Sequence, residues 1–350
     1  MGTDDMANER KRRVAVCMPV FNAEPWLKNS VQSILGQTYE DFDLFLCDDG
    51  STDGSFEIAS SFEDPRVRPL KNDRNKGPAE TRNRMNRNAI QQGYDYIAFM
   101  DADDVCRKDR LSTQIEILDR DPSLDICGAS CRVALTGGRW RVSEEPSKVK
   151  VDCLFHNPIP TPTAVVRTSC LAQTKIEFAP NMVPCADYDF FSKLVIESNR
   201  PAIGVDQDLL TYNYNEAGVS HNDKRAGQIK VDKKIKLNIS KILGLDVDSD
   251  IVSSFHDVAF RQEDVRYNDI LNFLVFAVQV IVQNDRGGAF FETAYLRSRF
   301  RSCLSFYKSK FNILKLSQTR ELEKTFVDSL GLSHGNAMTS ALLAEEILVR

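Results

Sequence analysis

Three carboxylates, Asp101, Asp103 and Asp104, follow the apolar residues 96–100. The apolar residues predict a strand, and side-chain alternation predicts that Asp104 points away from Asp101 and Asp103. Like charges a few ångströms apart repel by about 1 kcal/mol in water and by several times more near a protein surface. Oxygen ligands suit Mg²⁺ or Mn²⁺, which usually also accept phosphate oxygens. The pattern therefore indicates either a metal site for a nucleotide diphosphate or a solvated acidic loop.

A second acidic turn, residues 48–53, follows another apolar run at 42–47. Gly50 permits a tight backbone there, and the polar residues after it can start a helix. Asp49 can accept a hydrogen bond from an N–H of a nucleotide base, while the amides of the turn offer donors. In isolation such a turn would be a helix cap, so its order relative to the other motifs matters.

Strand-like and helix-like segments alternate through the first half of the chain, and this alternation predicts a mainly parallel sheet flanked by helices. In such α/β folds, ligands bind at the carboxyl ends of the strands, where both acidic turns fall. The expected strands are residues 14–21, 42–47, 67–70, 96–100 and 124–135, and the expected helices are 25–35, 55–62, 77–92 and 107–118.

The composition indicates a globular protein. The 350 residues are 42% hydrophobic and 27% charged, which suffices for one large core or a core with a smaller appended domain. The formal charge of −5 argues against a nucleic-acid-binding protein. An odd number of cysteines and the absence of a signal peptide predict reduced thiols in a cytoplasmic protein.

The longest apolar run, residues 270–282, is too short to span a bilayer and predicts a buried helix. Basic residues cluster at 10–13 and again at 224–241. They indicate either solvated helix faces or peripheral contact with anionic lipid at the inner face of a membrane.

Several motifs in the first half, taken together, resemble those of inverting family 2 glycosyltransferases, which use nucleotide diphosphate sugars and have the GT-A fold. The motifs are VCMPVFN (16–22), SILGQTY (33–39), DDGSTD (48–53), NKG (75–77), TRN (81–83) and DADD (101–104). The resemblance implies a GT-A domain over residues 13–222, a Rossmann-like α/β sheet. Residues 1–12 are then expected to form a disordered basic tail.

The resemblance also assigns roles to residues at these motifs. Asp49 would accept from a base imide, which favours a uridine donor, and Arg82 would either approach the diphosphate or form a helix-surface ion pair. Asp103 and Asp104 would hold Mn²⁺ or Mg²⁺, with Asp101 at the ribose or the ion. The full expected donor-binding set is Pro19, Phe21, Asn22, Asp49, Gly50, Lys76, Arg82, Asp101, Ala102 and Asp103.

An inverting transfer needs a base to take the acceptor's proton, and Asp187 stands at the position of the family's base. Ala186 replaces the usual glutamate beside it, and the alternative is that Asp187 only caps a helix. His156 is expected either to face the acceptor or to be structural. Asn213 and Asn215 stand where family members often have Arg and His, so the chain does without that His or uses His221.

After residue 222 apolar residues recur at helical spacing, which predicts a helical C-terminal subdomain over 223–350. The expected helices are residues 229–243, 264–282, 294–306 and 316–330.

The leading functional hypothesis is a metal-dependent inverting transferase. It would move a hexosyl or N-acetylhexosaminyl group from a UDP-sugar to a hydroxyl of a glycan or lipid-linked acceptor in surface polysaccharide synthesis. The alternative is a non-catalytic GT-A scaffold or donor-sensing subunit of a glycan-assembly complex. Nucleotidyl transfer lacks support, because no basic glycine-rich phosphate loop follows the first strand.

Overall fold

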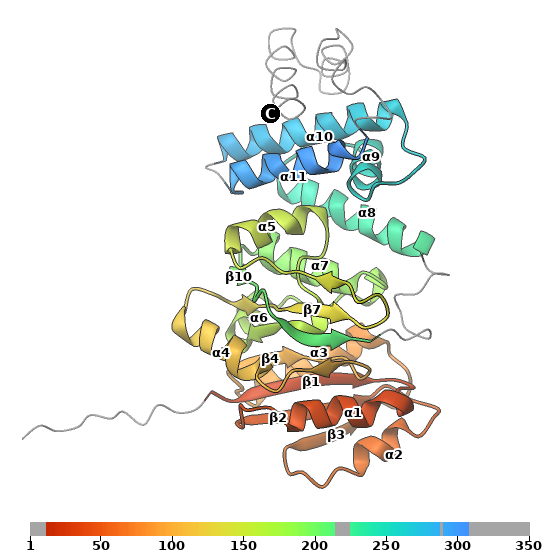
Figure 1. Cartoon of the computed structure of the whole chain (residues 1–350), viewed down its shortest axis with the longest axis vertical. Coiled ribbons are helices and arrows are strands. Elements are labelled where there is room, and N and C mark those ends of the chain that lie inside the picture. Colours follow the sequence, from red (N-terminus) through yellow and green to blue (C-terminus); the bar gives the residue numbers. More distant parts are fainter. Residues whose placement is uncertain (1–11, 214–224, 288–289, 308–350) are drawn as a thin grey trace, which may run out of the picture. The chain divides into compact units, whose positions relative to one another are not determined.

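The computed structural model describes residues 12–213, 225–287 and 290–307, which form two compact units (Figure 1). Within the described residues, the first unit comprises 12–144, 159–190 and 200–213. The second comprises 145–158, 191–199, 225–287 and 290–307. The predicted domain boundary at residue 222 stays a prediction. Residues 1–11 of the expected tail, Asn215, His221 and the expected helix 316–330 lie outside the described residues.

A seven-stranded sheet forms the centre of the first unit, in the order β10-β6-β9-β4-β1-β2-β3. Only β9 runs antiparallel to its neighbours, β4 and β6, so the predicted mainly parallel α/β sheet is confirmed. The strands are β1 (Val14–Val20), β2 (Phe42–Asp48), β3 (Val67–Lys71), β4 (Tyr96–Phe99), β6 (Ile126–Cys127), β9 (Val165–Arg167) and β10 (Ala202–Ile203).

The central strands are apolar throughout because helices cover both faces of the sheet. Residues 14–18 of β1 are fully buried, and so is all of β4. Helix α1 (Glu24–Leu35) has a proline in its first turn and buries Leu27, Val31 and Ile34, whose spacing gave the sequence signal. The other helices of this unit include α2 (Ser55–Ser60), α3 (Pro78–Gln91), α4 (Arg110–Arg120), α6 (Thr168–Thr174) and the first turn of α7 (Ala186–Ser192).

A smaller sheet has the order β5-β11-β7-β8, formed by β5 (Val105–Cys106), β11 (Asp208–Tyr212), β7 (Ser130–Val133) and β8 (Arg139–Trp140). The predicted strand region over 124–135 contains two strands, because the chain leaves the large sheet after β6 and enters the small one at β7. Gly128 lies at this change of sheet, where a Cβ atom would come within 2.7 Å of Ile159. The crossing therefore depends on a close approach that only glycine permits.

The second unit is helical. Its helices are α5 (Pro146–Phe155), a π-helix (Lys193–Glu197), α8 (Arg225–Ile242), α9 (Ser249–Ala259), α10 (Tyr267–Arg286) and α11 (Thr293–Ser305). The three predicted helices in the described part of this region are confirmed, and α9 was not predicted. The core holds a cluster of phenylalanines, with Phe255 stacked on Phe276 at 4.1 Å between ring centroids. Across the described ranges, no helix is long and apolar enough to cross a membrane.

All nine cysteines lie within the described residues, where each is buried and none is joined in a disulfide. Burial raises the pKa of several of them, to about 12 for Cys127 and about 11 for Cys303. The prediction of reduced thiols in a cytoplasmic protein stays a prediction.

Candidate functional site

The acidic turns meet because β1 lies between β2 and β4. The Asp49 amide donates to the carbonyl of Val20 at 2.7 Å, and the Met100 amide donates to that of Cys17 at 3.1 Å. Both turns therefore leave the sheet at its carboxyl edge on either side of the end of β1, as the parallel arrangement predicts.

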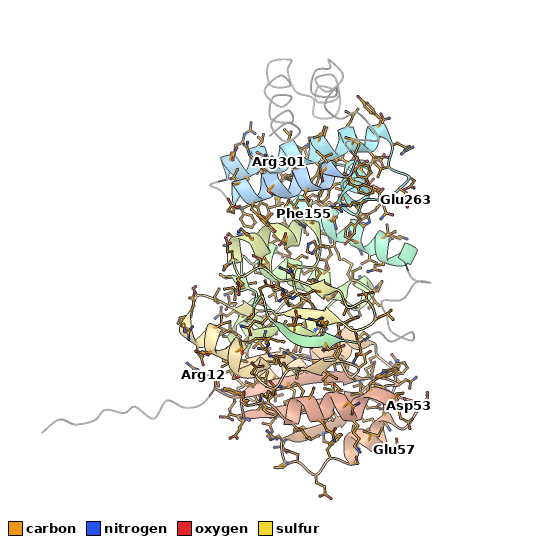
Figure 2. The ribbon with its side chains drawn as sticks, in the orientation of Figure 1. Arg12, Asp53, Glu57, Phe155, Glu263 and Arg301 are labelled. Atoms are coloured by element: carbon orange, nitrogen blue, oxygen red, sulfur yellow. The ribbon has the colours of Figure 1, made fainter. Side chains whose placement is uncertain are left out.

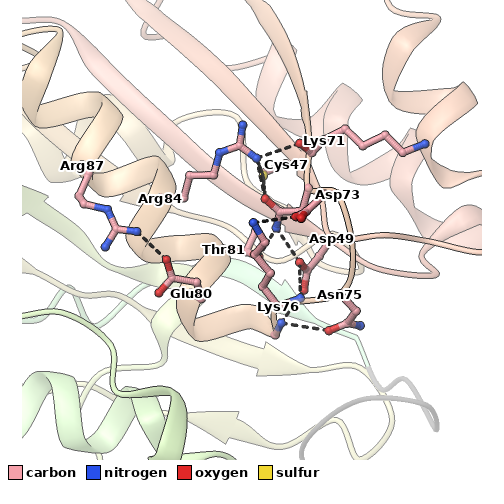
Figure 3. Close-up of polar contacts among 12 residues, drawn as sticks. Cys47, Asp49, Lys71, Asp73, Asn75, Lys76, Glu80, Thr81, Arg84 and Arg87 are labelled. Carbon is pink, nitrogen blue, oxygen red and sulfur yellow. Dashed lines mark hydrogen bonds and ion pairs between the residues drawn. The ribbon is translucent and has the colours of Figure 1, made fainter.

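Asp49 is buried and accepts three hydrogen bonds from the protein (Figure 3). Its Oδ1 accepts from Asn72 Nδ2 at 2.6 Å and from the amide of Lys76 at 2.9 Å. Its Oδ2 accepts from the amide of Gly77 at 2.8 Å. A carboxylate offers about four acceptor positions, so one position on Oδ2 remains for a ligand N–H.

A second layer of hydrogen bonds orients Asn72. Arg84 Nη1 donates to Asn72 Oδ1 at 2.6 Å and to the carbonyl of Lys71 at 2.9 Å, which leaves the amide nitrogen facing Asp49 and Thr81 (Figure 3). The close-up also shows that this network links the end of β3 to the first turns of α3. The sequence gave no sign of Asn72 or Arg84.

Gly50 and Asn22 shape the neighbouring backbone. Gly50 has φ +76°, and a Cβ there would lie 2.8 Å from the nitrogen of Asn75, so the turn requires glycine. Asn22 Oδ1 accepts from the amide of Thr52 at 2.9 Å, which joins the end of β1 to the turn after β2. Phe21 beside it is 47% exposed. The structure thus brings together predicted residues of the motifs at 16–22 and 48–53.

The other predicted donor residues lie around the same edge. Pro19 is opposite Cys47 in the sheet register, and the ammonium of Lys76 pairs with Asp73 at 2.7 Å. Ala102 is buried beside Asp101.

Arg82 on α3 pairs with Asp101 at 2.5 Å, and only 13% of its side chain is exposed. Ser30 Oγ of α1 donates to the Asp101 carbonyl at 3.1 Å. Arg82 is therefore held against the acidic motif and is not an ordinary surface residue, and it brings a permanent cation to the end of β4.

Asp104 is fully buried, and it differs in this from Asp101 and Asp103. Its Oδ1 accepts from the amide of Asn213 at 2.8 Å, while its Oδ2 has no hydrogen-bond partner among the described residues. Burial, reinforced by the charges of Asp101 and Asp103, raises the pKa of Asp104 well above its usual value. Residues 101–104 form a turn, with the Asp104 amide donating to the Asp101 carbonyl, so simple strand alternation does not continue to this point.

Two residues that support this turn were not identified from the sequence. Asn213 also donates through Nδ2 to the carbonyl of Asp103 at 2.7 Å, so it holds the acidic turn from β11. Arg110 of α4 is fully buried and donates from Nη2 to the carbonyl of Phe99 at 2.7 Å, and its charge lowers the pKa of Asp104. The sequence did indicate that Arg110 is buried, because it occupies the same buried face of α4 as Gln114 and Leu118.

The described part of the chain holds no group of three or more His, Cys, Asp or Glu arranged as a metal site. The oxygen donors that are present nevertheless fit Mn²⁺ or Mg²⁺. These ions are commonly held by one or two carboxylates together with substrate phosphates and water. The buried Oδ2 of Asp104, which lacks a hydrogen-bond donor, is the observation that favours a cation here.

Asp187 lies in the first turn of α7 in the first unit. Its Oδ1 accepts from the amide of Tyr188 at 2.8 Å, and Thr161 Oγ1 donates to its Oδ2 at 3.5 Å. His156 belongs to the second unit, where burial lowers its pKa and its Nδ1 lies 2.9 Å from the carbonyl of Asn157. The residues that the structure brings together are therefore those of the donor and metal sets.

The chain is similar to known proteins in sequence and in fold. Residues 15–176 match the family model described as glycosyl transferase family 2. An uncharacterised glycosyltransferase of Haemophilus influenzae is 41% identical over 107 residues, which are 30% of this chain and 42% of that protein. The Escherichia coli protein named UDP-Glc:alpha-D-GlcNAc-diphosphoundecaprenol beta-1,3-glucosyltransferase WfgD is 36% identical over 105 residues, 30% of this chain and 40% of that one. The chain thus spans less than half the length of these two relatives.

Longer matches are more distant. A second uncharacterised H. influenzae glycosyltransferase is 23% identical over 91% of this chain and 98% of its own. The crystal structure of S. aureus TarS 1-349 in complex with UDP-GlcNAc superposes with a TM-score of 0.57 at 17% identity, covering 86% of this chain and 92% of that one. The fold is therefore that of the GT-A glycosyltransferases. The chain carries a domain that belongs to glycosyl transferase family 2.

Proposed function

We propose that the protein transfers a sugar from a UDP-sugar to a hydroxyl of a lipid-linked or glycan acceptor in the synthesis of a cell-surface glycan. The main observation in support is the carboxylate of Asp49, buried and cradled by three donors at the strand edge shared with the acidic turn. The remaining acceptor position suits the imide N–H of uracil. The printed name of WfgD includes a UDP-sugar donor and a diphosphoundecaprenol-linked acceptor, and TarS 1-349 was crystallised with UDP-GlcNAc.

On this proposal the donor lies along the carboxyl edge of the sheet. Pro19, Phe21 and Asn22 contact the base and ribose, and Gly50 lets the backbone approach them. Arg82 and Lys76 offset the charge of the diphosphate, as permanent or nearly permanent cations do best.

Asp103 and Asp104 would hold the Mn²⁺ or Mg²⁺ ion, with Asp101 and Ala102 beside the ribose. When bound, such an ion stabilises the negative charge that develops on a diphosphate leaving group. The ion pair between Asp101 and Arg82 would keep the Arg82 guanidinium close to the diphosphate oxygens of the donor.

Asp187 is proposed as the general base. Its carboxylate takes the proton of the acceptor hydroxyl as that oxygen attacks the anomeric carbon from the face opposite the diphosphate. The new glycosidic C–O bond forms, the bond from the anomeric carbon to the phosphate oxygen breaks, and UDP leaves with the electron pair. The configuration at the anomeric carbon is therefore inverted. Because a lipid-linked acceptor lies at a membrane, we place this reaction in the cytoplasm at the membrane's inner face.

Donor binding can be tested without knowing the acceptor. Thermal unfolding would be measured with UDP, GDP, ADP and CDP, each with and without Mn²⁺. A ligand at about 100 times its dissociation constant adds about 2.7 kcal/mol to the free energy of unfolding. We expect stabilisation by UDP that depends on Mn²⁺ and is lost in Asp49→Ala.

Glu57→Gln is the control, because Glu57 is an exposed carboxylate on α2, and this variant should respond like the wild type (Figure 2). Equal responses to all four nucleotides would contradict the role of Asp49.

Catalysis is tested separately with Asp187→Asn. General-base groups typically contribute a factor of about 10²–10⁴ to the rate, so this variant should bind UDP normally while transfer falls by about that factor. Transfer would be followed with labelled UDP-sugars and lipid-linked acceptors. Normal turnover by Asp187→Asn would exclude it as the base. UDP binding by the wild type without any turnover would instead favour a donor-sensing subunit.

A further inference from the structure

The second unit contains a small pocket with basic walls. It has a volume of about 90 Å³ and lies between the end of α5, the end of α9 and one face of α11. Its polar walls are His156, Arg261, Arg299 and Ser302, and its apolar walls include Phe155 and Phe260. None of its lining residues is acidic. Figure 2 labels Phe155 at one end of α5.

Both guanidinium groups in this pocket have unused hydrogen-bond donors. Arg299 lies 3.0 Å from Asp152 through Nε, and no acceptor for its two terminal nitrogens is found among the described residues. Arg261 has no carboxylate partner within the described ranges; its guanidinium lies 5.6 Å from the ring of Phe306. Arg261 is exposed and Arg299 is half-buried, so both guanidinium groups can offer these donors to an oxyanion that enters the pocket.

The carboxylates near the pocket are already paired with other groups. Asp152 on α5 contacts Arg299 and accepts from the hydroxyl of Tyr295 at 3.0 Å. Asp232 on α8 binds Lys236 and His256. Asp257 and Asp264 act with Arg261 on the pKa of Tyr307, but neither forms an ion pair with Arg261, and Asp257 pairs with Lys233.

The backbone of Arg261 supports a role for its side chain. It follows the end of α9 with φ +55°, a left-handed conformation in which glycine is favoured and other residues lose about 1 kcal/mol. Residues held in such conformations concentrate at functional sites. An arginine kept where glycine is easier is consistent with a guanidinium that has a ligand.

We propose that this pocket binds a phosphate-class oxyanion through Arg261 and Arg299. Two guanidinium forks can hold tetrahedral oxygens in bidentate fashion, and the volume accommodates a single phosphoryl group. Ser302 and the second ring nitrogen of His156 are further polar contacts. The oxyanion comes either from free phosphate or from a phosphorylated lipid head group. The site belongs to the second unit and does not depend on the proposed UDP-sugar site.

The test measures binding of inorganic phosphate to the full chain by titration calorimetry, and variants of the pocket residues show whether the binding belongs to this site. Arg261→Gly suits the positive φ, so it should fold at least as well as the wild type while removing the guanidinium. Arg299→Gln removes the second guanidinium group of the pocket. Arg301→Gln is the matched control, because Arg301 is on α11 but does not line the pocket.

We expect saturable binding that weakens by about tenfold or more in Arg261→Gly and Arg299→Gln and is unchanged in Arg301→Gln. Vesicles of phosphatidic acid in phosphatidylcholine separate the two sources. If they compete with phosphate and phosphatidylcholine alone does not, the ligand is a lipid head group; if they do not compete, it is free phosphate. The absence of saturable phosphate binding, or equal binding by all three variants and the wild type, would overturn the proposal.

Discussion

Asp104 shows how one residue combines a structural cost with a functional use. Its carboxyl group is buried, faces two neighbouring carboxylates, and has one oxygen without a donor in the described structure. Ionising it in the folded chain is unfavourable unless a cation is bound. The residue therefore makes the stability of the free protein depend on pH.

The sign of this dependence follows from the raised pKa. Below the ordinary Asp value of 3.8 the carboxyl is protonated in both states and costs nothing. As the pH rises, the unfolded chain releases the proton first, so the folded state loses stability until its own raised pKa is passed.

We predict that Asp104→Asn stabilises the metal-free protein at pH 7 by about 1–3 kcal/mol, the usual penalty of an unsatisfied buried polar group. The gain should shrink as the pH falls toward 4, because Asp104 is then increasingly protonated in the unfolded chain as well. Urea unfolding from pH 4 to pH 8 measures it, with Glu57→Gln as control. A variant less stable than the wild type at pH 7 would show that Asp104 is not destabilising.

At this scale the sequence predicted the acidic groups but not their supports. Asp49 and the three carboxylates of residues 101–104 stand out because their type and spacing are unusual after apolar runs. The contact of Asn213 with Asp104 could not be predicted, because it joins residues 109 positions apart, and the helix face of Arg110 indicated burial but not its bond to the carbonyl of Phe99. Long-range hydrogen bonds of this kind leave no local pattern.

Pairs of elements are joined by similar buried polar contacts. In the second unit, Asp232 of α8 accepts from Lys236 at 2.5 Å on the same helix and lies 2.5 Å from His256 Nδ1 of α9. Burial alone would raise the pKa of Asp232, but Lys236 and His256 hold it below its usual value. Burial also lowers the pKa of His256, so the Asp232–Lys236 ion pair and the imidazole form one hydrogen-bonded cluster that links α8 to α9.

We predict that Asp232→Asn destabilises the second unit by about 3–5 kcal/mol, because it leaves the fully buried ammonium of Lys236 without its counter-charge. Adding Lys236→Met should recover most of this loss, since no buried charge then remains. Chemical denaturation monitored by circular dichroism gives both values. The exposed Asp246→Asn is the control, and a double variant no more stable than the single one would contradict the argument.

Elements were well predicted where apolar periodicity was strong. The strands after residues 14, 42 and 96 and the long helices near 229 and 267 are close to their expected bounds. The change of sheet between β6 and β7 was missed because both strands are short and only two residues separate them, and the close approach of Gly128 to Ile159 leaves no local pattern in the sequence. Helix α9 was missed even though Asp248 caps it, accepting from the amides of residues 250 and 251.

The whole molecule contains two compact units that we expect to bind different ligands. A ligand stabilises only the structure that forms its site, so the two sites should be distinguishable by where amide exchange slows.

We predict that UDP with Mn²⁺ slows hydrogen exchange at the ends of β1, β2 and β4, whereas phosphate slows it in α9 and α11. Exchange followed by mass spectrometry measures both, with Asp49→Ala and Arg261→Gly as the respective controls. Protection of both units by either ligand alone would show that they open together and would contradict separate sites.

The buried thiols have a practical consequence. Two of the nine, Cys153 and Cys303, lie in the second unit, and the other seven lie in the first. Thiolates are the reactive form, so burial and raised pKa values both protect these groups from alkylating reagents in the folded state. Every alkylation event then records a transient opening, and peptide mapping assigns it to a unit. The native cysteines, at least two in each unit, can therefore report the rate at which each unit opens, and no engineered label is needed.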